Sequence, residues 1–148
     1  MSSVGSLFET IEDRAVERAY AVLASRMDPS PTARQLSLLR IIADRRGADR
    51  AISVTQLAAM VKTTPREVKG DVRDLRMSFG VRIGSSRDQE SGGYYLITSK
   101  AELIATLTPM CHQLRSEVNV ICAMCEPQEL AELEGQMGMK LGFSKVAA

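Results

Sequence analysis

Four basic residues recur at helical spacing near the middle of the chain. The segment 65–79 predicts a helix. At a rotation of about 100° per residue, the other three basic residues fall within about 80° of Arg66 around the helix axis. The four are Arg66, Lys69, Arg73 and Arg76. Lys69 and Arg73 stand four positions apart and repel each other, a repulsion that a bound anion would relieve. The pattern favours anion binding along this face, with Gly70 beside it to allow close approach of a backbone.

The same helix has a defined start and two further faces. Thr64 and Glu67 form a capping box, with Pro65 at the first helical position. The hydroxyls of Thr63 and Thr64 and the free N–H groups of the first turn suit a phosphate. The apolar stripe is Val68, Val72, Leu75 and Phe79, and the acidic stripe is Glu67, Asp71 and Asp74. A solvated helix whose arginines only keep the protein soluble is the alternative, but sorting of charge by sign favours anion binding.

The charge of the chain is unevenly distributed. The net charge is +1, from 19 Lys and Arg against 18 Asp and Glu. Residues 51–100 hold eight basic and five acidic residues, whereas residues 101–148 hold three basic and six acidic. Residues 62–87 alone hold seven basic residues against three acidic ones. Near-neutrality therefore does not exclude a nucleic-acid partner, but it predicts weak non-specific binding and reliance on a doubled site.

Two closely spaced start signals predict a pair of short helices. A capping box at Ser53 begins a helix over 54–61, and the helix over 65–79 follows after only three residues. This spacing is typical of a helix-turn-helix. The β-branched segment 81–85 and the aromatic segment 94–98 then predict a β-hairpin around a polar, Gly-containing loop.

Helices are also expected on both sides of this central region. They are predicted at residues 4–27, at 31–46, at 99–125 and from residue 127 onward. Ser30 is expected to cap the second of these, and Pro109 is expected to interrupt or kink the third. The expected fold class is therefore mainly α with a small β-hairpin.

The order helix, helix, turn, helix, hairpin resembles the winged helix-turn-helix domain of the biotin-repressor, DeoR-type and WYL-type bacterial regulators. The resemblance covers residues 52–98, from ISVTQLAAMVKTTPREVKGDVRDLRMSFGVRI to GGYYL. It implies that the helix matching 65–78 enters the major groove of duplex DNA while the hairpin, the wing, contacts flanking backbone. The residues it would place at DNA are Thr63, Thr64, Arg66, Lys69, Gly70 and Arg73, with Arg87 at the wing tip. The basic stripe adds Arg76 to this set.

The resemblance also suggests a domain organisation. Residues 1–28 are expected to form an N-terminal amphipathic helix, 31–98 the winged helix-turn-helix domain, and 99–148 a C-terminal helical region. About 50 residues follow the wing, so no sugar-phosphate-binding, biotin-ligase or WYL domain is expected. The N-terminal apolar stripe is Phe8, Ile11, Ala15, Ala19 and Val22. The terminal helices either complete the core or make a homodimer; we favour the homodimer, since such regulators commonly pair two recognition helices on a two-fold site.

Three cysteines and one histidine lie in the C-terminal region. Cys111, His112, Cys122 and Cys125 could suggest a metal site. On a straight helix, however, Cys111 and Cys122 lie about 16 Å apart along the axis, too far for one tetrahedral ion. The three cysteines share one face, which favours small buried hydrophobes over metal binding or redox sensing.

Several classes of function are disfavoured. No run of about 20 apolar residues exists, so no membrane span is expected, and the small polar N-terminus predicts no secretory signal. An odd cysteine count favours the reducing cytoplasm. No nucleophile–base set and no Gly-rich phosphate loop is present, so neither an enzyme nor a cofactor is expected. We therefore predict a transcriptional regulator that binds double-stranded DNA as a homodimer. The alternatives are a protein-interaction winged helix, a phage or plasmid replication accessory, and a metal or thiol sensor.

Overall fold

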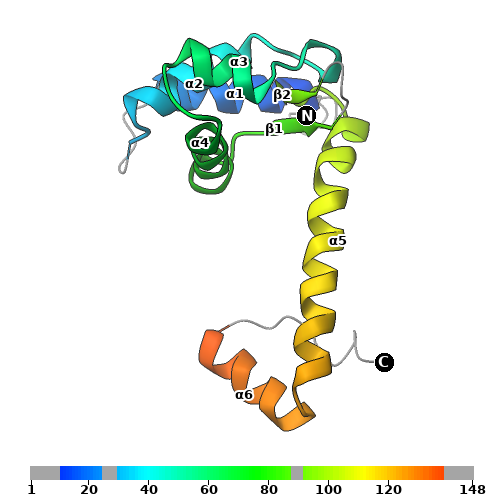
Figure 1. Cartoon of the computed structure of the whole chain (residues 1–148). Helices are drawn as coiled ribbons and strands as arrows, with labels where there is room; N and C mark the ends of the chain where they lie inside the picture. The colour runs from blue at the N-terminus through cyan, green and yellow to red at the C-terminus, as the bar shows by residue number, and fades with distance from the viewer. Residues whose placement is uncertain (1–10, 25–29, 88–91, 139–148) are drawn as a thin grey trace, which may run out of the picture. The chain divides into compact units, whose positions relative to one another are not determined.

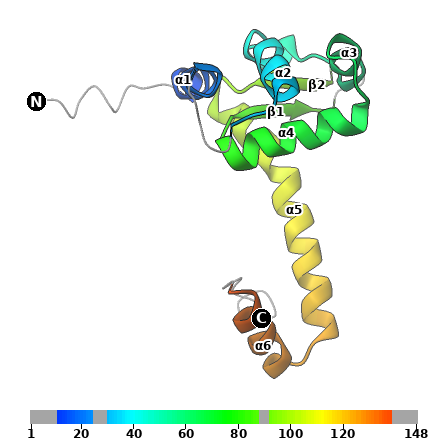
Figure 2. The same ribbon diagram turned by 90° about the vertical axis from the view of Figure 1, so that its left-hand side faces the viewer.

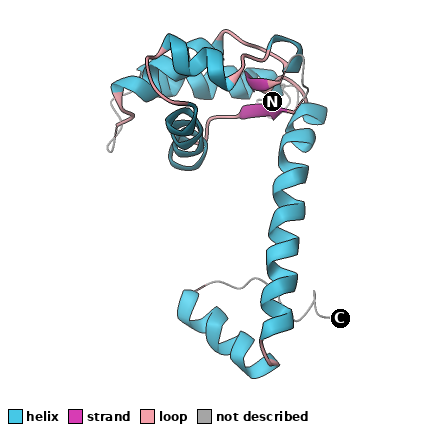
Figure 3. Cartoon of the chain, viewed as in Figure 1, coloured by secondary structure: helices cyan, strands magenta, loops and turns pink. Residues whose placement is uncertain are grey.

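The computed structural model describes residues 11–24, 30–87 and 92–138, which fall into two compact units, Met1–Thr106 and Leu107–Ala148. The described helices are α1 (Ile11–Ala24), α2 (Ala33–Ala43), α3 (Val54–Met60), α4 (Pro65–Phe79), α5 (Lys100–Met124) and α6 (Pro127–Met137), with one 3-10 turn, η2 (Ala48–Arg50) (Figure 1). The strands are β1 (Ile83–Ser86) and β2 (Gly93–Leu96). The fold is thus mainly α with one small hairpin, as predicted (Figure 3).

Side-chain caps set the starts of the central helices. The capping boxes at Ser53 and Thr64 are both formed, and Gly80 ends α4 in the left-handed conformation. The predicted N-cap of α2 was wrong by two residues. Its N-cap is Thr32, not Ser30, because the Thr32 hydroxyl accepts from the Gln35 N–H while the Gln35 side chain accepts from the Thr32 N–H.

A third segment, at Ile52, pairs with the hairpin of β1 and β2. β1 pairs antiparallel with β2, with Ile83 opposite Leu96 and Ser86 opposite Gly93. On the other edge of β2, Ile52 and Tyr94 exchange two backbone hydrogen bonds of 2.9 Å each. At Gly93, where φ is 152°, an added Cβ would lie 2.0 Å from the Ile52 carbonyl oxygen. This close approach ties the wing to the segment before α3.

Helices α1, α2, α3 and α4 lie around the hairpin in the first unit (Figure 2). All of these elements contribute side chains to one apolar core. Fully buried side chains include Leu38, Leu39 and Ile42 of α2, Leu57 of α3, Val68, Val72 and Leu75 of α4, and Ile83 and Leu96 of the hairpin. The predicted apolar stripe of α4 is therefore confirmed. Helix α2 lies centrally, since it contacts α1, α4 and β2.

The N-terminal stripe packs into this same core. Ala15, Ala19 and Val22 of α1 are at most 1% exposed and belong to the core of the first unit. Small side chains here allow α1 to approach α2 closely. Of the two roles considered for the terminal helices, α1 thus has the first, completing the core. The expected start at residue 4 and the side chains of Phe8 and Ile11 lie outside what the structure describes.

Pro109 was predicted to interrupt or kink helix α5, and it does not interrupt it, because the backbone stays helical from Lys100 to Met124. A hydrogen bond from the Glu102 N–H to the Ser99 hydroxyl begins it. In the second unit, Val118 of α5 and Leu130 of α6 are the buried pair around which α6 packs. None of the described helices has both the length and the apolar character needed to cross a bilayer.

Candidate nucleic-acid interface

A tight turn joins α3 to α4 and sets the direction in which α4 leaves. Lys62 takes a left-handed conformation with φ of 55°, unusual for a residue with a side chain. The Thr63 N–H then donates to the Ala58 carbonyl at 2.9 Å and closes the end of α3. The chain is thereby turned into the capping box of Thr64, so two helices meet through a very short connection, as predicted.

Three cations of α4 face outward. Arg66, Lys69 and Arg73 are exposed, and we call them the basic face. No hydrogen bond or ion pair within the described part of the chain engages their side chains. A Cβ added at Gly70, which lies beside them, would meet no atom within 4 Å. The basic face is therefore open and carries three uncompensated positive charges, as the helical spacing of these three residues predicted.

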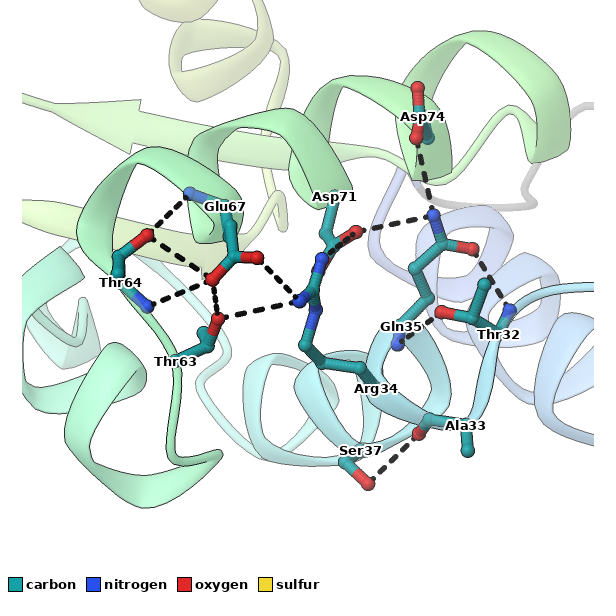
Figure 4. A network of polar contacts seen from close by, with 10 residues as sticks. All are labelled: Thr32, Ala33, Arg34, Gln35, Ser37, Thr63, Thr64, Glu67, Asp71 and Asp74. Atoms are coloured by element: carbon teal, nitrogen blue, oxygen red, sulfur yellow. Dashed lines mark hydrogen bonds and ion pairs between the residues drawn. The ribbon is translucent and has the colours of Figure 1, made fainter.

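The acidic stripe of α4 is bonded to α2, with Asp71 buried and Glu67 and Asp74 still exposed. Arg34 Nε of α2 donates to Asp71 Oδ2 at 2.6 Å, and Arg34 Nη1 lies 3.2 Å from Glu67 Oε1 (Figure 4). Gln35 Nε2 donates to Asp71 Oδ1 at 3.4 Å and to Asp74 Oδ2 at 3.2 Å. We call Arg34, Gln35, Glu67, Asp71 and Asp74 the α2–α4 clamp. The hydrogen bond to Asp71 raises the pKa of the Arg34 guanidinium above its ordinary value.

The clamp determines which face of α4 points outward. It holds all three acidic side chains against α2, so rotation of α4 about its axis would break several polar contacts at once. Sequence reasoning missed Arg34 and Gln35 entirely. The signal available was Thr32-Ala-Arg-Gln35, a capping box that places Gln35 in the first turn of α2. Nothing in that pattern showed that the same glutamine would also reach two carboxylates.

The start of α4 is less open to a phosphate than expected. The Glu67 carboxylate accepts from the Thr63 hydroxyl and from the Thr64 N–H, while the Glu67 N–H donates to Thr64 Oγ1 at 3.3 Å. These bonds, led by the one from Thr63, lower the pKa of Glu67 to about 2. A carboxylate thus occupies the helix N-terminus and engages the Thr63 hydroxyl and the Thr64 N–H, which disfavours a phosphate at that point. The DNA contact predicted for Thr63 and Thr64 stays a prediction.

Arg76 does not belong to the basic face. Its Nε donates to the Ile83 carbonyl at 2.9 Å, and its guanidinium lies 5.7 Å from the centre of the Tyr94 ring. One nitrogen, Nη2, is buried without a hydrogen-bond partner in the described structure, and burial lowers the pKa of the group. Arg76 therefore joins α4 to the hairpin, and the expectation that it faces outward with the other three was wrong.

The wing contributes one described basic residue near its tip. Arg87 follows β1 directly and is exposed. Residues 88–91, which complete the predicted tip, lie outside the described residues. Arg87 is thus accessible, as a wing-tip contact requires.

The cysteines divide into two kinds. Cys122 and Cys125 are half-buried against Val118 and Leu130, as expected of small hydrophobes. Cys111 is exposed, so the prediction of a buried face was wrong for this residue; the adjacent His112 is exposed as well. Within the described ranges, no cluster of three or more His, Cys, Asp or Glu side chains could hold a metal ion.

No protein-family model, no curated protein and no solved structure matches this chain.

Proposed function

We propose that the first unit is a winged helix-turn-helix that binds double-stranded DNA sequence-specifically, and that the protein acts as a transcriptional regulator. The observation that carries this proposal is that α4 has its acidic and basic side chains on separate faces. Its acidic face is held against α2 by the clamp, while Arg66, Lys69 and Arg73 are left exposed and unpaired. Three positive charges thus lie on one exposed face of a helix that follows a tight turn. Such a face suits the groove of a polyanion such as duplex DNA.

In the proposed complex, α4 lies in the major groove. Arg73 and Arg66 have the bidentate donors that recognise guanine edges, and Lys69 supplies a flexible cation for a base or a phosphate. Gly70 leaves room beside them for the sugar-phosphate backbone. Arg87 of the wing adds a flanking phosphate contact. Since Glu67 fills the helix N-terminus, affinity depends on these side chains more than on backbone N–H groups.

The proposal includes a homodimer in the cytoplasm. One recognition helix contacts few base pairs, so a near-neutral protein gains affinity by placing two copies on a doubled site. The three cysteines are free thiols, a state that the reducing cytoplasm maintains. Binding of this kind requires neither a cofactor nor a catalytic group.

Selection from a random duplex pool with the full chain, followed by fluorescence anisotropy on the recovered sequences, tests the proposal. We expect two related half-sites and an affinity that falls steeply between about 50 and about 200 mM salt. Arg73→Ala should weaken specific binding by about 1–3 kcal/mol. The charge-matched control is Arg45→Ala with Arg50→Ala, two exposed arginines outside α4.

The decisive variant is Lys69→Ala with Arg73→Ala. Specific binding that survives this double change, or that falls equally in the Arg45 and Arg50 control, would remove α4 as the recognition helix. Salt-sensitive binding to an acidic protein, with no duplex recovered from the pool, would favour the protein-interaction alternative instead.

A further inference from the structure

The second unit exposes an unusual amount of apolar surface. Six of the ten large hydrophobic side chains that are exposed in the described structure belong to it: Leu107, Met110, Leu114, Val120, Met124 and Met137. Its own core has Val118 and Leu130 as buried residues, with Ile121, Cys122 and Cys125 packed around them. A segment of this size rarely buries enough apolar surface to be stable by itself. The second unit therefore needs a further packing partner.

Four side chains in the first half of α5 have an apolar or cysteine counterpart eleven residues later. Apolar or cysteine side chains recur in the pairs Leu107 and Val118, Met110 and Ile121, Cys111 and Cys122, and Leu114 and Cys125. An eleven-residue repeat corresponds to about 3.67 residues per turn, close to that of a straight helix. Seven of the eight side chains therefore stay on one side of α5, within an arc of about 120°, and Cys125 directly follows the last residue of the helix. We call the eight side chains the α5 stripe.

Among the residues that the structure describes, only half of the α5 stripe has apolar cover from the same chain. The later half, from Val118 on, packs against Leu130 of α6. In the earlier half, Leu107 is 45% exposed, Met110 43% and Leu114 57%, and Cys111 is exposed too. A stripe that continues past its intrachain cover indicates that the earlier half packs against another molecule.

The charges beside the α5 stripe indicate which molecule this is. Between Leu107 and Cys125, the formally charged residues are Arg115 and Glu117 alone. They lie on opposite edges of the stripe, each about 80° from its centre. If a second α5 packs parallel by two-fold symmetry, the Arg115 edge of each copy meets the Glu117 edge of the other. An antiparallel pair would place like charges together, so the charges are self-complementary only in the parallel arrangement.

We infer that a second copy of this chain docks on the first half of the α5 stripe in parallel, with Leu107, Met110, Cys111 and Leu114 facing their own counterparts. This inference gives the proposed homodimer its surface, and it rests on the proposed function only in naming the same dimer. Its tests use no DNA, so the dimer surface and DNA recognition can fail separately.

Sedimentation equilibrium of the full chain under reducing conditions tests the surface. We expect a dimer at tens of micromolar concentration, and Leu114→Glu should raise the dimer dissociation constant at least about 100-fold because it buries two carboxylates. The matched control is Val120→Glu, a change to a residue 52% exposed on the opposite side of α5, which should stay dimeric. A monomeric wild-type chain, or equal loss in both variants, overturns the inference.

Two further variants test the arrangement without relying on Leu114. Arg115→Glu should weaken the dimer by placing two carboxylates at each edge, and adding Glu117→Arg should restore it by swapping both charges. In a chain with all three cysteines changed to Ser, Leu107→Cys should form a covalent dimer under mild copper–phenanthroline oxidation. A double swap that fails to restore the dimer, or a dimer that does not cross-link at position 107, overturns the parallel arrangement.

Discussion

In the α2–α4 clamp, the two partners of the Arg34–Asp71 ion pair are buried to different extents. This difference predicts which of the two substitutions costs more stability. The Asp71 side chain is 7% exposed, whereas that of Arg34 is 39% exposed. Arg34→Ala removes a donor from a carboxylate that cannot reach water, leaving it only the Gln35 contact at 3.4 Å. Asp71→Ala leaves a guanidinium that keeps Glu67 at 3.2 Å and can turn to solvent. The first change should therefore cost more stability than the second.

The magnitudes follow from where the pair lies between surface and core. An exposed ion pair contributes at most roughly 1 kcal/mol, and breaking a fully buried pair costs about 3–5 kcal/mol. In Arg34→Ala the cost comes from the Asp71 carboxylate, which is only 7% exposed; a buried charged acceptor left without its donor costs about 2–3 kcal/mol of unfolding free energy. Asp71→Ala should cost about 1–2 kcal/mol, close to one charged hydrogen bond. The double variant should cost less than the two single changes added together.

Urea unfolding at pH 7 followed by tyrosine fluorescence measures these values in the right part of the chain. All three tyrosines, Tyr20, Tyr94 and Tyr95, lie in the first unit, so their signal reports that unit. Arg40→Ala, an exposed arginine on the same helix, is the control and should change stability by less than about 0.5 kcal/mol. If Arg34→Ala is no worse than this control, or if Asp71→Ala is the more damaging change, the clamp does not hold α4 as argued.

Three further outcomes are expected. Gly70→Ala should stabilise the free protein by about 0.5–1 kcal/mol, since its Cβ meets open space, yet weaken DNA binding; thermal denaturation and anisotropy measure the two, and unchanged binding would contradict the close backbone approach. Because the pKa of Glu67 is lowered to about 2, its contribution to stability is present above about pH 4.5 and is lost as the pH falls toward 2. Glu67→Gln should therefore lose less stability than the wild type over that interval, and parallel acid-unfolding curves would argue against this role. Arg76→Met should leave DNA affinity unchanged, because this guanidinium lies under the hairpin, and a loss as large as that of Arg73→Ala would return Arg76 to the interface.

The elements themselves were largely predictable from local chemistry. The capping boxes at Ser53 and Thr64 and the glycine at Gly80 satisfy or relieve backbone groups within a few residues, so they act wherever the helix lies. The apolar period of α4 likewise predicted its buried stripe. The error at Ser30 arose between two neighbouring candidates for one cap, and the Gln35 side chain decided it in favour of Thr32.

The candidate site was only partly predictable, because a helical wheel gives an angle about one axis and not the neighbour found at that angle. Arg73 and Arg76 differ by about 60° on the wheel, and both were placed on one basic stripe. Arg76 lies at the edge nearest the apolar residues, where the hairpin covers it. Asp71, on the opposite edge, meets Arg34, a residue 37 positions earlier.

The sequence by itself determined the starts of α3 and α4, the turn between them, the hairpin, and three cations with the same orientation on α4. Only the tertiary structure decided that the acidic stripe is bonded to α2, that Glu67 fills the start of α4, and that Arg76 supports the wing. The physical reason is range. Caps and periodicity act over about four residues, whereas the fate of a charged side chain depends on burial and on partners that folding brings from distant positions.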